Sequence, residues 1–268
     1  MNPALRLAVE AALEAGKIQR ERSDRVGKIT YKGEIDLVTE VDLLCEQEII
    51  GRIKKQFPDH DILAEESGAT KGSSGHRWII DPLDGTVNYS HGFPSYCVSI
   101  ALEIDGEAEL GVIYSPRLDE LFVAEKGKGS TLNSKPISVS SVASIKKSLL
   151  ITGFAYDVAR SDNDNLDHFC NFIKESQAVR RMGSAALDLC YTAMGRAEGF
   201  WELNLNAWDV AAGSLIVQEA GGKVTRFDGD RFRFEDREIL ATNGLVHQPM
   251  MDVLKRGKSG YAGIARAR

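Results

Sequence analysis

The feature that most constrains the fold is an apolar run that ends in two carboxylates, in residues 78–86 (WIIDPLDGT). A short apolar run bounded by turn residues is typical of a buried strand. Pro82 lacks an N–H group, so we expect the chain to leave the sheet there with Asp81 and Asp84 near its edge. The glycine and threonine that follow can begin a helix, where backbone amides commonly hold phosphate oxygens. Carboxylates beside such amides indicate metal-assisted phosphoryl chemistry.

A second apolar run, in residues 61–66 (DILAEE), also ends in acid. If the two strands are parallel neighbours, Glu65, Asp81 and Asp84 meet at one sheet edge, where open α/β sheets place their ligands. A single acid at the end of a strand is usually a solvated turn residue. Two apolar strands with the same ending, one of them followed by Asp-Gly-Thr, favour a metal site instead.

Two further acids, Asp42 and Asp209, lie in patterns that have two interpretations. Residues 39–42 (TEVD) and 206–209 (NAWD) resemble capping boxes, in which the acid accepts from a backbone amide at the start of a helix. Capping and metal binding are compatible, and the residues alone leave both roles open. Lys32, taken alone, is typical of a surface lysine.

The periodicity of apolar residues predicts two kinds of organisation along the chain. Residues 4–22 and 42–57 have helical periodicity, residues 31–39 between them suggest a turn and a short connector, and residues 95–124 alternate as antiparallel strands do. After residue 145, helices are expected at 163–175, 184–194, 207–220 and 245–256, and strands at 149–152, 178–181, 199–202, 223–227 and 238–242.

We therefore expect two layered lobes. Residues 1–145 would form a mainly antiparallel α+β lobe with most of the proposed metal ligands. Residues 146–256 would form an α/β lobe that carries Asp209 and the substrate contacts. Residues 257–268, which are basic and rich in Gly and Ala, are expected to be a flexible tail.

Composition narrows the class of protein. A formal net charge of -6 gives no general attraction to nucleic acid or to an anionic membrane. The 268 residues include no signal-like leader and no apolar run of transmembrane length, so we expect a cytoplasmic protein. The four cysteines are widely spaced and are expected to be buried thiols, and the histidines offer no zinc-site spacing. The lack of a G-x-S-x-G elbow argues against a serine nucleophile.

Taken together, the acidic motifs resemble those of the inositol monophosphatase family, part of the wider group of metal-dependent, lithium-sensitive sugar phosphatases. The resemblance spans roughly residues 5–255 and rests on residues 65–67 (EES), 78–88 (WIIDPLDGTVN) and 208–213 (WDVAAG), with residues 36–42 upstream. It implies the layered αβαβα sandwich of inositol monophosphatases and fructose bisphosphatases, two to three Mg²⁺ ions as cofactor, and a homodimer. The motifs are specific for the superfamily and much less so for the substrate.

The resemblance also implies which residues hold the metal ions. Glu65, Asp81 and the carbonyl group of Leu83 would bind the first Mg²⁺. Asp81, Asp84 and Asp209 would bind the second. Glu65 would also help to hold a weaker third ion.

Further roles follow from the same resemblance. Thr86, with Asp42 behind it, would orient the attacking water, and Lys32 matches a family lysine near that network. The backbone amides of Gly85 and Thr86 would bind phosphate oxygens. The alcohol part of the substrate would be contacted by Gly183, Ser184, Ala185 and Glu202, next to Asp209.

The leading hypothesis is hydrolysis of a small phosphate monoester such as myo-inositol 1-phosphate, by in-line attack of an activated water. Glu202 favours a polyol, because a carboxylate accepts hydrogen bonds from hydroxyl groups. The neutral side chains of Asn204 and Asn206 argue against a second phosphate, whereas Arg180 and Arg181 argue for one. Fructose 1,6-bisphosphatase, histidinol-phosphate phosphatase and adenosine 3',5'-bisphosphate phosphatase therefore stay open.

A regulatory binding protein on the same fold is the alternative from a different class. The intact set of acids argues against loss of activity, and the negative net charge argues against direct RNA binding. We therefore expect a small phosphorylated polyol or sugar as ligand, with no membrane partner and no nucleic acid.

Overall fold

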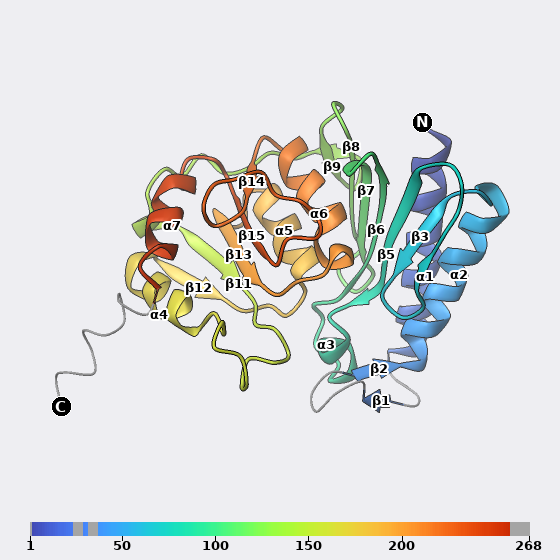
Figure 1. Ribbon diagram of the computed structural model, residues 1–268, viewed down its shortest axis with the longest axis horizontal. Coiled ribbons are helices and arrows are strands. Elements are labelled where there is room, and N and C mark those ends of the chain that lie inside the picture. Colours follow the sequence, from blue (N-terminus) through green and yellow to red (C-terminus); the bar gives the residue numbers. More distant parts are fainter. Residues whose placement is uncertain (1, 24–28, 32–36, 258–268) are drawn as a thin grey trace.

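Five layers in the order αβαβα make up the computed structural model, as the sequence predicts (Figure 1). The structure describes residues 2–23, 29–31 and 37–257. Within these residues, an eight-stranded sheet and a five-stranded sheet lie on either side of a central pair of helices, and two further pairs of helices cover the outside.

The first outer layer and the first sheet come from the N-terminal half of the chain. Helices α1 (Pro3–Arg22) and α2 (Glu40–Gln56) cover the outer face of the sheet. The strand order is β10-β9-β8-β7-β6-β5-β3-β4. The bounds of the strands are β3 (Asp61–Ala64), β4 (Gly68–Thr70), β5 (His76–Asp84), β6 (Cys97–Ile104), β7 (Glu107–Ser115), β8 (Glu120–Glu125), β9 (Ser130–Leu132) and β10 (Lys135–Pro136).

The remaining layers come from the C-terminal half. Helices α5 (Ala185–Ala193) and α6 (Ala207–Glu219) form the central layer, and α4 (Leu166–Glu175) and α7 (His247–Leu254) form the last one. The second sheet has the order β12-β11-β13-β15-β14. Its strands are β11 (Leu149–Thr152), β12 (Ala178–Arg180), β13 (Gly199–Leu203), β14 (Lys223–Thr225) and β15 (Glu238–Thr242). A division into lobes at residue 145 remains a proposal.

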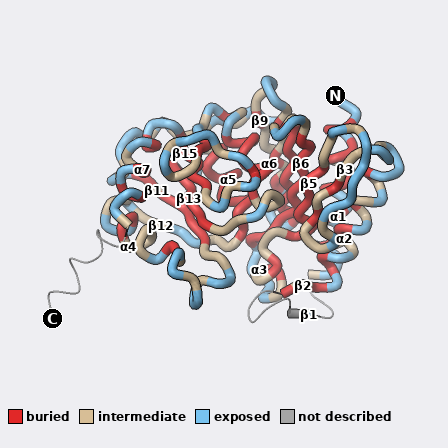
Figure 2. The backbone as a smooth tube through the Cα atoms, in the orientation of Figure 1, coloured by how far each residue is buried: buried red, intermediate tan, exposed pale blue. Residues whose placement is uncertain are grey.

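The layering follows from where the apolar side chains point. Successive residues of β5 face opposite sides of the sheet, so Trp78 and Ile80 pack with α1 and α2, whereas Ile79 packs with α5 and α6. Because both faces are covered there, residues 78–80 are apolar at three successive positions instead of alternating. A third apolar cluster, which includes Phe172 and Trp201, lies between the second sheet and the last pair of helices. Figure 2 shows the buried residues concentrated along the two sheets and the central helices.

The expected pairing of the two acid-tipped strands is confirmed. Strand β3 is parallel to β5, with Ala64 opposite Ile80. The expectation that Pro82 ends the pairing is wrong, because β5 continues to Asp84, which is opposite Cys97 of β6. A register irregularity between Asp81 and Asp84 accommodates the proline, which strands tolerate at such bulges.

Three local expectations also need correction. Residues 29–31 and 37–39 form strands β1 and β2, which pair antiparallel instead of making a turn and a connector. Helix α4 begins at Leu166 and not at 163, because Asn165 before it is left-handed, with a φ of 64°. Strand β14 ends at Thr225 and not at 227.

Other expectations fall on residues outside the described part of the chain. These are Lys32, Asp36 and the basic tail from residue 258 onward. Cys45, Cys97 and Cys190 are buried free thiols as expected, and Cys170 is partly buried. None of the helices in the described part of the chain has the length and apolar character needed to cross a membrane.

Helix α6 is held unusually close to its neighbours by glycines. A Cβ atom on Gly111 of β7 would lie 2.7 Å from the carbonyl oxygen of Ala212, and one on Gly213 would lie 2.8 Å from Cβ of Leu189 in α5. Small residues at these contacts let α6 approach both the first sheet and α5. This packing fixes the position of the helix whose first turn carries Asp209.

Candidate active site

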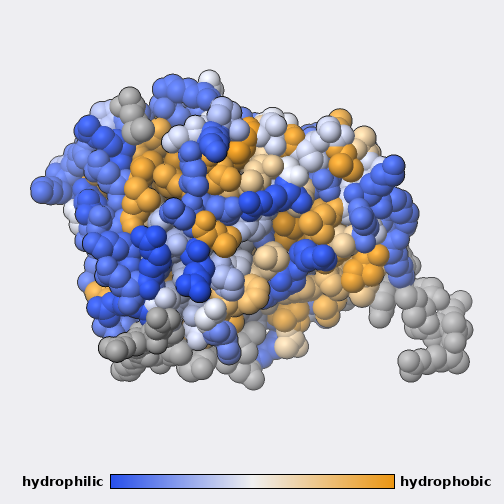
Figure 3. All heavy atoms as spheres, turned by 180° about the vertical axis from the view of Figure 1, so that it is seen from behind, coloured by the Kyte–Doolittle hydropathy of each residue, from blue (hydrophilic) through white to orange (hydrophobic). Residues whose placement is uncertain are grey.

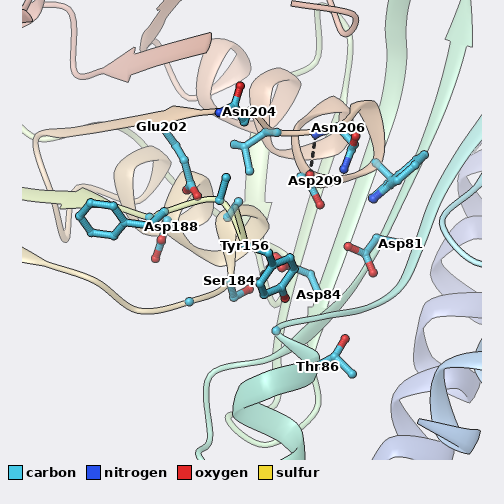
Figure 4. Close-up of a pocket in the computed structure, with 18 of the residues that line it drawn as sticks. Asp81, Asp84, Thr86, Tyr156, Ser184, Asp188, Glu202, Asn204, Asn206 and Asp209 are labelled. Carbon is cyan, nitrogen blue, oxygen red and sulfur yellow. Dashed lines mark hydrogen bonds between the residues drawn. The ribbon is translucent and has the colours of Figure 1, made fainter. Parts of the chain in front are cut away.

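A cavity of about 310 Å³ opens where the end of β5 meets the central helices and the second sheet. Figure 4 shows its acidic side chains converging from several elements, with Asp81 and Asp84 from the first sheet, Asp209 from α6 and Glu202 from β13. The residues that line it are Glu65, Asp81, Leu83, Asp84, Gly85, Thr86, Gly153, Phe154, Ala155, Tyr156, Arg181, Gly183, Ser184, Ala185, Asp188, Glu202, Asn204, Leu205, Asn206, Trp208 and Asp209.

Asp84 joins the two halves of the cavity. Its Oδ2 atom accepts hydrogen bonds from the hydroxyl group of Ser184 at 2.7 Å and from the backbone amide of Ala186 at 2.8 Å. These donors lie at the start of α5, so the carboxylate of Asp84 caps that helix. The contact holds the loop before α5 against the turn that follows β5.

Gly85 and Asn88 strengthen the same junction. Gly85 has a φ of +91°, and a Cβ atom there would lie 2.7 Å from the carbonyl oxygen of Ser95, so this turn requires glycine. The amide nitrogen of Asn88 donates to the carbonyl groups of Ser95 at 2.7 Å and Met182 at 2.8 Å. Residues 183–185 are thereby held beside the first turn of α3 (Thr86–Ser90).

Asp42 has both of the roles that its sequence pattern allows. Its Oδ2 atom accepts from the backbone amide of Thr39 at 2.9 Å, which completes a capping box at the start of α2. Its Oδ1 atom is 3.0 Å from the hydroxyl group of Thr86, which is also 3.0 Å from the carbonyl oxygen of Leu83. Asp42 is fully buried and does not line the cavity, so it acts on the site through Thr86.

Asp209 also caps a helix and, unlike Asp42, lines the cavity. Its Oδ2 atom accepts from the backbone amide of Asn206 at 2.7 Å, at the start of α6. Asp81 likewise accepts from the backbone amide of Leu83 at 2.9 Å through its Oδ1 atom. Each of these bonds engages one oxygen of the carboxylate.

The crowding of acids raises their pKa values. Burial raises the pKa of Asp81 well above its usual range, and the charges of Glu65, Asp84 and Asp209 raise it further. Burial raises the pKa of Asp84 to about 6, although the bonds from Ser184 and Ala186 lower it. The pKa of Asp209 is also raised, by burial and by the charge of Asp84. These carboxyl groups disfavour one another's ionised forms, and a cation bound between them would favour the ionised forms.

Comparison with known proteins shows the family to which the chain belongs. A sequence model of the inositol monophosphatase family matches residues 1–257. The chain belongs to this family. Its members are phosphatases, which hydrolyse phosphoric monoesters.

The chain resembles relatives named inositol monophosphatase and relatives named SuhB. It is 46% identical to an inositol-1-monophosphatase of Synechocystis over 266 residues, which cover 98% of this chain and 93% of that protein. It is 42% identical to the Nus factor SuhB of Haemophilus influenzae, over 95% of this chain and 97% of that protein.

Solved structures of the family have the same fold. The inositol monophosphatase of Anabaena has a TM-score of 0.87 and 43% identity, over 94% of this chain and 95% of that one. The extragenic suppressor protein suhB of Bartonella henselae has a TM-score of 0.89 and 39% identity, over 95% of this chain and 99% of that one.

The donor set fits the metal dependence that is general in inositol monophosphatases. Carboxylate and carbonyl oxygens are the ligands that Mg²⁺ prefers, and the raised pKa values show repulsion that a cation would relieve. Within the described residues, no three Asp, Glu, His or Cys side chains are already close enough to share an ion. Binding would therefore require these side chains to turn toward one another, and their role as ligands stays a prediction.

The structure brings together most residues that the sequence singles out. Every predicted metal and substrate residue lines the cavity, and Asp42 contacts it through Thr86. Arg181 lines the cavity, whereas Arg180 points its guanidinium toward the carbonyl group of Val179 and does not.

Sequence reasoning missed Asp188 and residues 153–156. Asp188 follows an Ala-Ala-Leu run in the first turn of α5. An acid in the first turn interacts favourably with the helix dipole, so its presence there does not indicate a cavity. Residues 153–156 lie in a loop without a recognisable motif. Only the packing of β11 beside β13 brings that loop to Glu202.

Proposed function

We propose that this chain catalyses the Mg²⁺-dependent hydrolysis of a small phosphate monoester, with myo-inositol 1-phosphate as its preferred substrate. The observation that carries the proposal is the convergence of Glu65, Asp81, Asp84 and Asp209 on one cavity. Two features of that cavity suit such a reaction. The acids are suited to bind cations, and the backbone amides of the Gly85–Thr86 turn are suited to bind phosphate.

Two to three Mg²⁺ ions would be held by the carboxylates of Glu65, Asp81, Asp84 and Asp209 and by the carbonyl group of Leu83. When bound, such ions activate water and stabilise the charge that develops on the attacking and leaving oxygens. Because their donors come from β5, the loop after β3 and the start of α6, the positions of three elements determine the geometry of the site.

The chain's own groups position the nucleophile and the phosphate. The hydroxyl group of Thr86 is held at 3.0 Å by Asp42, which lies behind it, so it is oriented to direct a water toward phosphorus. The backbone amides of Gly85 and Thr86 would bind phosphate oxygens. Lys32, which lies outside the described residues, is proposed to assist this network.

The alcohol part of the ester would occupy the side of the cavity formed by Gly183, Ser184, Ala185 and Glu202. Glu202 can accept hydrogen bonds from hydroxyl groups. Among the described residues, Arg181 is the one cation that lines the cavity, and it is exposed. A second phosphate would therefore meet several carboxylates and a single cation, which favours a monophosphate over a bisphosphate.

Phosphate release from a panel of esters tests the proposal. The panel contains myo-inositol 1-phosphate, fructose 1,6-bisphosphate, histidinol phosphate and adenosine 3',5'-bisphosphate, each assayed with Mg²⁺ and with EDTA. We expect the highest kcat/KM for the inositol ester and no turnover in EDTA. A higher kcat/KM for a bisphosphate would contradict the assignment of substrate, and turnover in EDTA would contradict the metal dependence.

The names of some relatives favour a second candidate, a regulatory role through a macromolecular partner. The relative from Haemophilus influenzae is named a Nus factor, and so is one from Pseudomonas aeruginosa that is 41% identical. A pull-down that recovers a stoichiometric partner, together with no phosphate release across the panel, would place this role first. We also propose a cytoplasmic location, which fractionation of the cells would test. From the family resemblance we propose a homodimer, which sedimentation of the purified protein would test.

A further inference from the structure

Two carboxyl groups of the cavity, those of Asp188 and Glu202, lie away from the proposed metal ligands. Figure 4 shows them on the same side of the cavity, with Asp81 on the opposite side. Asp188 is 1% exposed, and both of its carboxyl oxygens are buried with no hydrogen-bond partner among the described residues. Buried polar groups in folded proteins are nearly always paired, so this exception needs an explanation.

Glu202 occupies a place that a glycine leaves open. A Cβ atom on Gly153 would lie 2.2 Å from Oε1 of Glu202 and 2.3 Å from Oε2. Gly153 does not have a left-handed backbone, so its backbone conformation does not require glycine. A side chain at this position would, however, displace the carboxyl group of Glu202 from the place that it occupies.

Burial and charge act on the two acids together. Burial raises the pKa of Asp188 well above its usual range, and the charge of Glu202 is the next largest cause, ahead of that of Asp84. The exposed guanidinium of Arg181 opposes both effects. These influences favour a neutral carboxylic acid at Asp188 beside Glu202. A neutral carboxylic acid donates a hydrogen bond and an ionised one only accepts, whereas a hydroxyl group does both.

We propose that Asp188 and Glu202, with room made by Gly153, form a carboxyl pair that selects esters whose alcohol carries hydroxyl groups near the phosphate. The inference rests on the proposed function and identifies the determinant of its substrate class. Both residues line the cavity, but the carboxyl oxygens of Asp188 are buried, so Asp188 is a positioning residue that acts on the substrate through its effect on Glu202. Gly153 is the second positioning residue, because it sets where that carboxyl group lies.

The test measures a ratio that a purely structural role would leave unchanged. For each variant, kcat/KM is measured with Mg²⁺ for myo-inositol 1-phosphate and for phenyl phosphate, whose alcohol part carries no further hydroxyl group. In Asp188→Ala we expect the ratio of the two values to fall about tenfold, which is the effect of losing the one hydrogen bond that a neutral Asp188 would donate to Glu202 when the substrate is bound. Asp188→Asn should keep at least about a third of the ratio, because its amide still donates a hydrogen bond.

Gly153→Ala provides a second and independent variant. Its added methyl group displaces the carboxyl group of Glu202, so the ratio should fall about tenfold or more. Gly51→Ala is a matched control, because a Cβ atom at Gly51 meets nothing within 4 Å. Asp252→Asn is the control for the change of charge, on the exposed surface of α7. Both controls should keep the wild-type ratio.

Three results would overturn the inference alone, and a fourth would overturn the proposed function as well. The first is an unchanged ratio in Asp188→Ala and Gly153→Ala. The second is an equal loss for both esters together with a lower melting temperature, which indicates a structural role. The third is a wild-type protein that hydrolyses phenyl phosphate with Mg²⁺ but does not prefer the inositol ester, in which case the phosphatase assignment stands. A wild-type protein that hydrolyses neither ester refutes the proposed function, and this inference with it.

Discussion

Replacing Asp84 by Asn should stabilise the metal-free protein while it abolishes turnover. Asp84 lies in the cavity with Asp81 and Asp209. Burial disfavours its ionised form, and its charge in turn raises the pKa values of these two neighbours. Asparagine has nearly the same shape and carries no charge. Its side-chain oxygen can still accept from the hydroxyl group of Ser184 and the amide of Ala186. The substitution therefore removes repulsion while it leaves the cap of α5 in place.

The magnitude follows from the pKa of Asp84, which is about 6 in the folded protein against an ordinary value of 3.8. The difference corresponds to about 3 kcal/mol of destabilisation at neutral pH. Asp84 is partly exposed at the cavity, so water screens part of this cost. The neutral amide also accepts weaker hydrogen bonds than a carboxylate does. We expect a net gain of about 1 kcal/mol in the free energy of unfolding.

Urea denaturation in EDTA measures this gain, and its pH dependence checks the cause. An acid with a raised pKa contributes stability that is fully present below about 3.8 and is lost as the pH rises through about 6. The metal-free wild type should therefore lose more stability between about pH 4 and neutral pH than Asp84→Asn does. With Mg²⁺, the wild type should gain more stability than the variant.

Two results would refute this reasoning. A variant that is less stable than the wild type in EDTA at neutral pH would show that the carboxylate of Asp84 stabilises the metal-free fold on balance. A variant that keeps the wild-type rate at saturating Mg²⁺ would show that Asp84 is not a metal ligand. Circular dichroism of both proteins verifies that the fold is intact in each case.

Three further experiments, on Asp209, on Thr86 and with Li⁺, separate the proposed roles. Asp209→Asn should change stability by about 1 kcal/mol or less, because relief of a buried charge offsets the weaker cap of α6, and it should eliminate activity. Activity would survive if Asp209 only caps α6, and melting and turnover are measured on one sample. Thr86→Val removes the hydroxyl group held by Asp42 and should lower kcat by about 100-fold, whereas Thr86→Ser keeps it and should stay within about tenfold; equal losses would contradict its role in orienting water. Li⁺ should inhibit uncompetitively toward substrate, because it would replace the second ion after phosphate has formed; steady-state rates that show competition, or insensitivity to millimolar Li⁺, would contradict this mechanism.

Features set by neighbouring residues could be predicted from the sequence. The acid-tipped strands at Glu65 and Asp81 were predictable because apolar runs covered on both faces have no alternation to obscure them. The starts of α2 and α6 were predictable because a capping box lies within four residues. The layered fold came from the family resemblance, since local periodicity does not fix the order of strands.

Features set by distant packing could not be predicted. The irregularity that lets β5 continue past Pro82 depends on β6 opposite it. The burial of Asp188 depends on the covering of α5 by both sheets, and the contact between Gly153 and the carboxyl group of Glu202 joins residues that are 49 positions apart in the chain. Nothing in the sequence near Asp188 or Gly153 distinguishes them from an ordinary helix acid and an ordinary loop glycine.

The acids of the cavity have structural roles of their own, which explains how the cluster forms before any ion binds. Asp84 caps α5, Asp209 caps α6, and Asp81 binds the amide of Leu83 two residues further along β5. Asp42, which lies behind the cavity, caps α2. Each cap satisfies backbone amides that folding would otherwise leave unpaired, and this offsets part of the cost of gathering like charges.

The same arrangement predicts how the protein tolerates change. Asparagine can accept the capping bonds but has no charge to bind a cation, so Asn variants at Asp84 and Asp209 should fold and lose activity. Alanine removes the cap as well, so Asp84→Ala and Asp209→Ala should each lose about 1 kcal/mol or more relative to their Asn counterparts. Denaturation of the four variants in EDTA measures these differences. Equal stabilities within each Ala and Asn pair would show that the caps contribute nothing and that the acids are retained for catalysis alone.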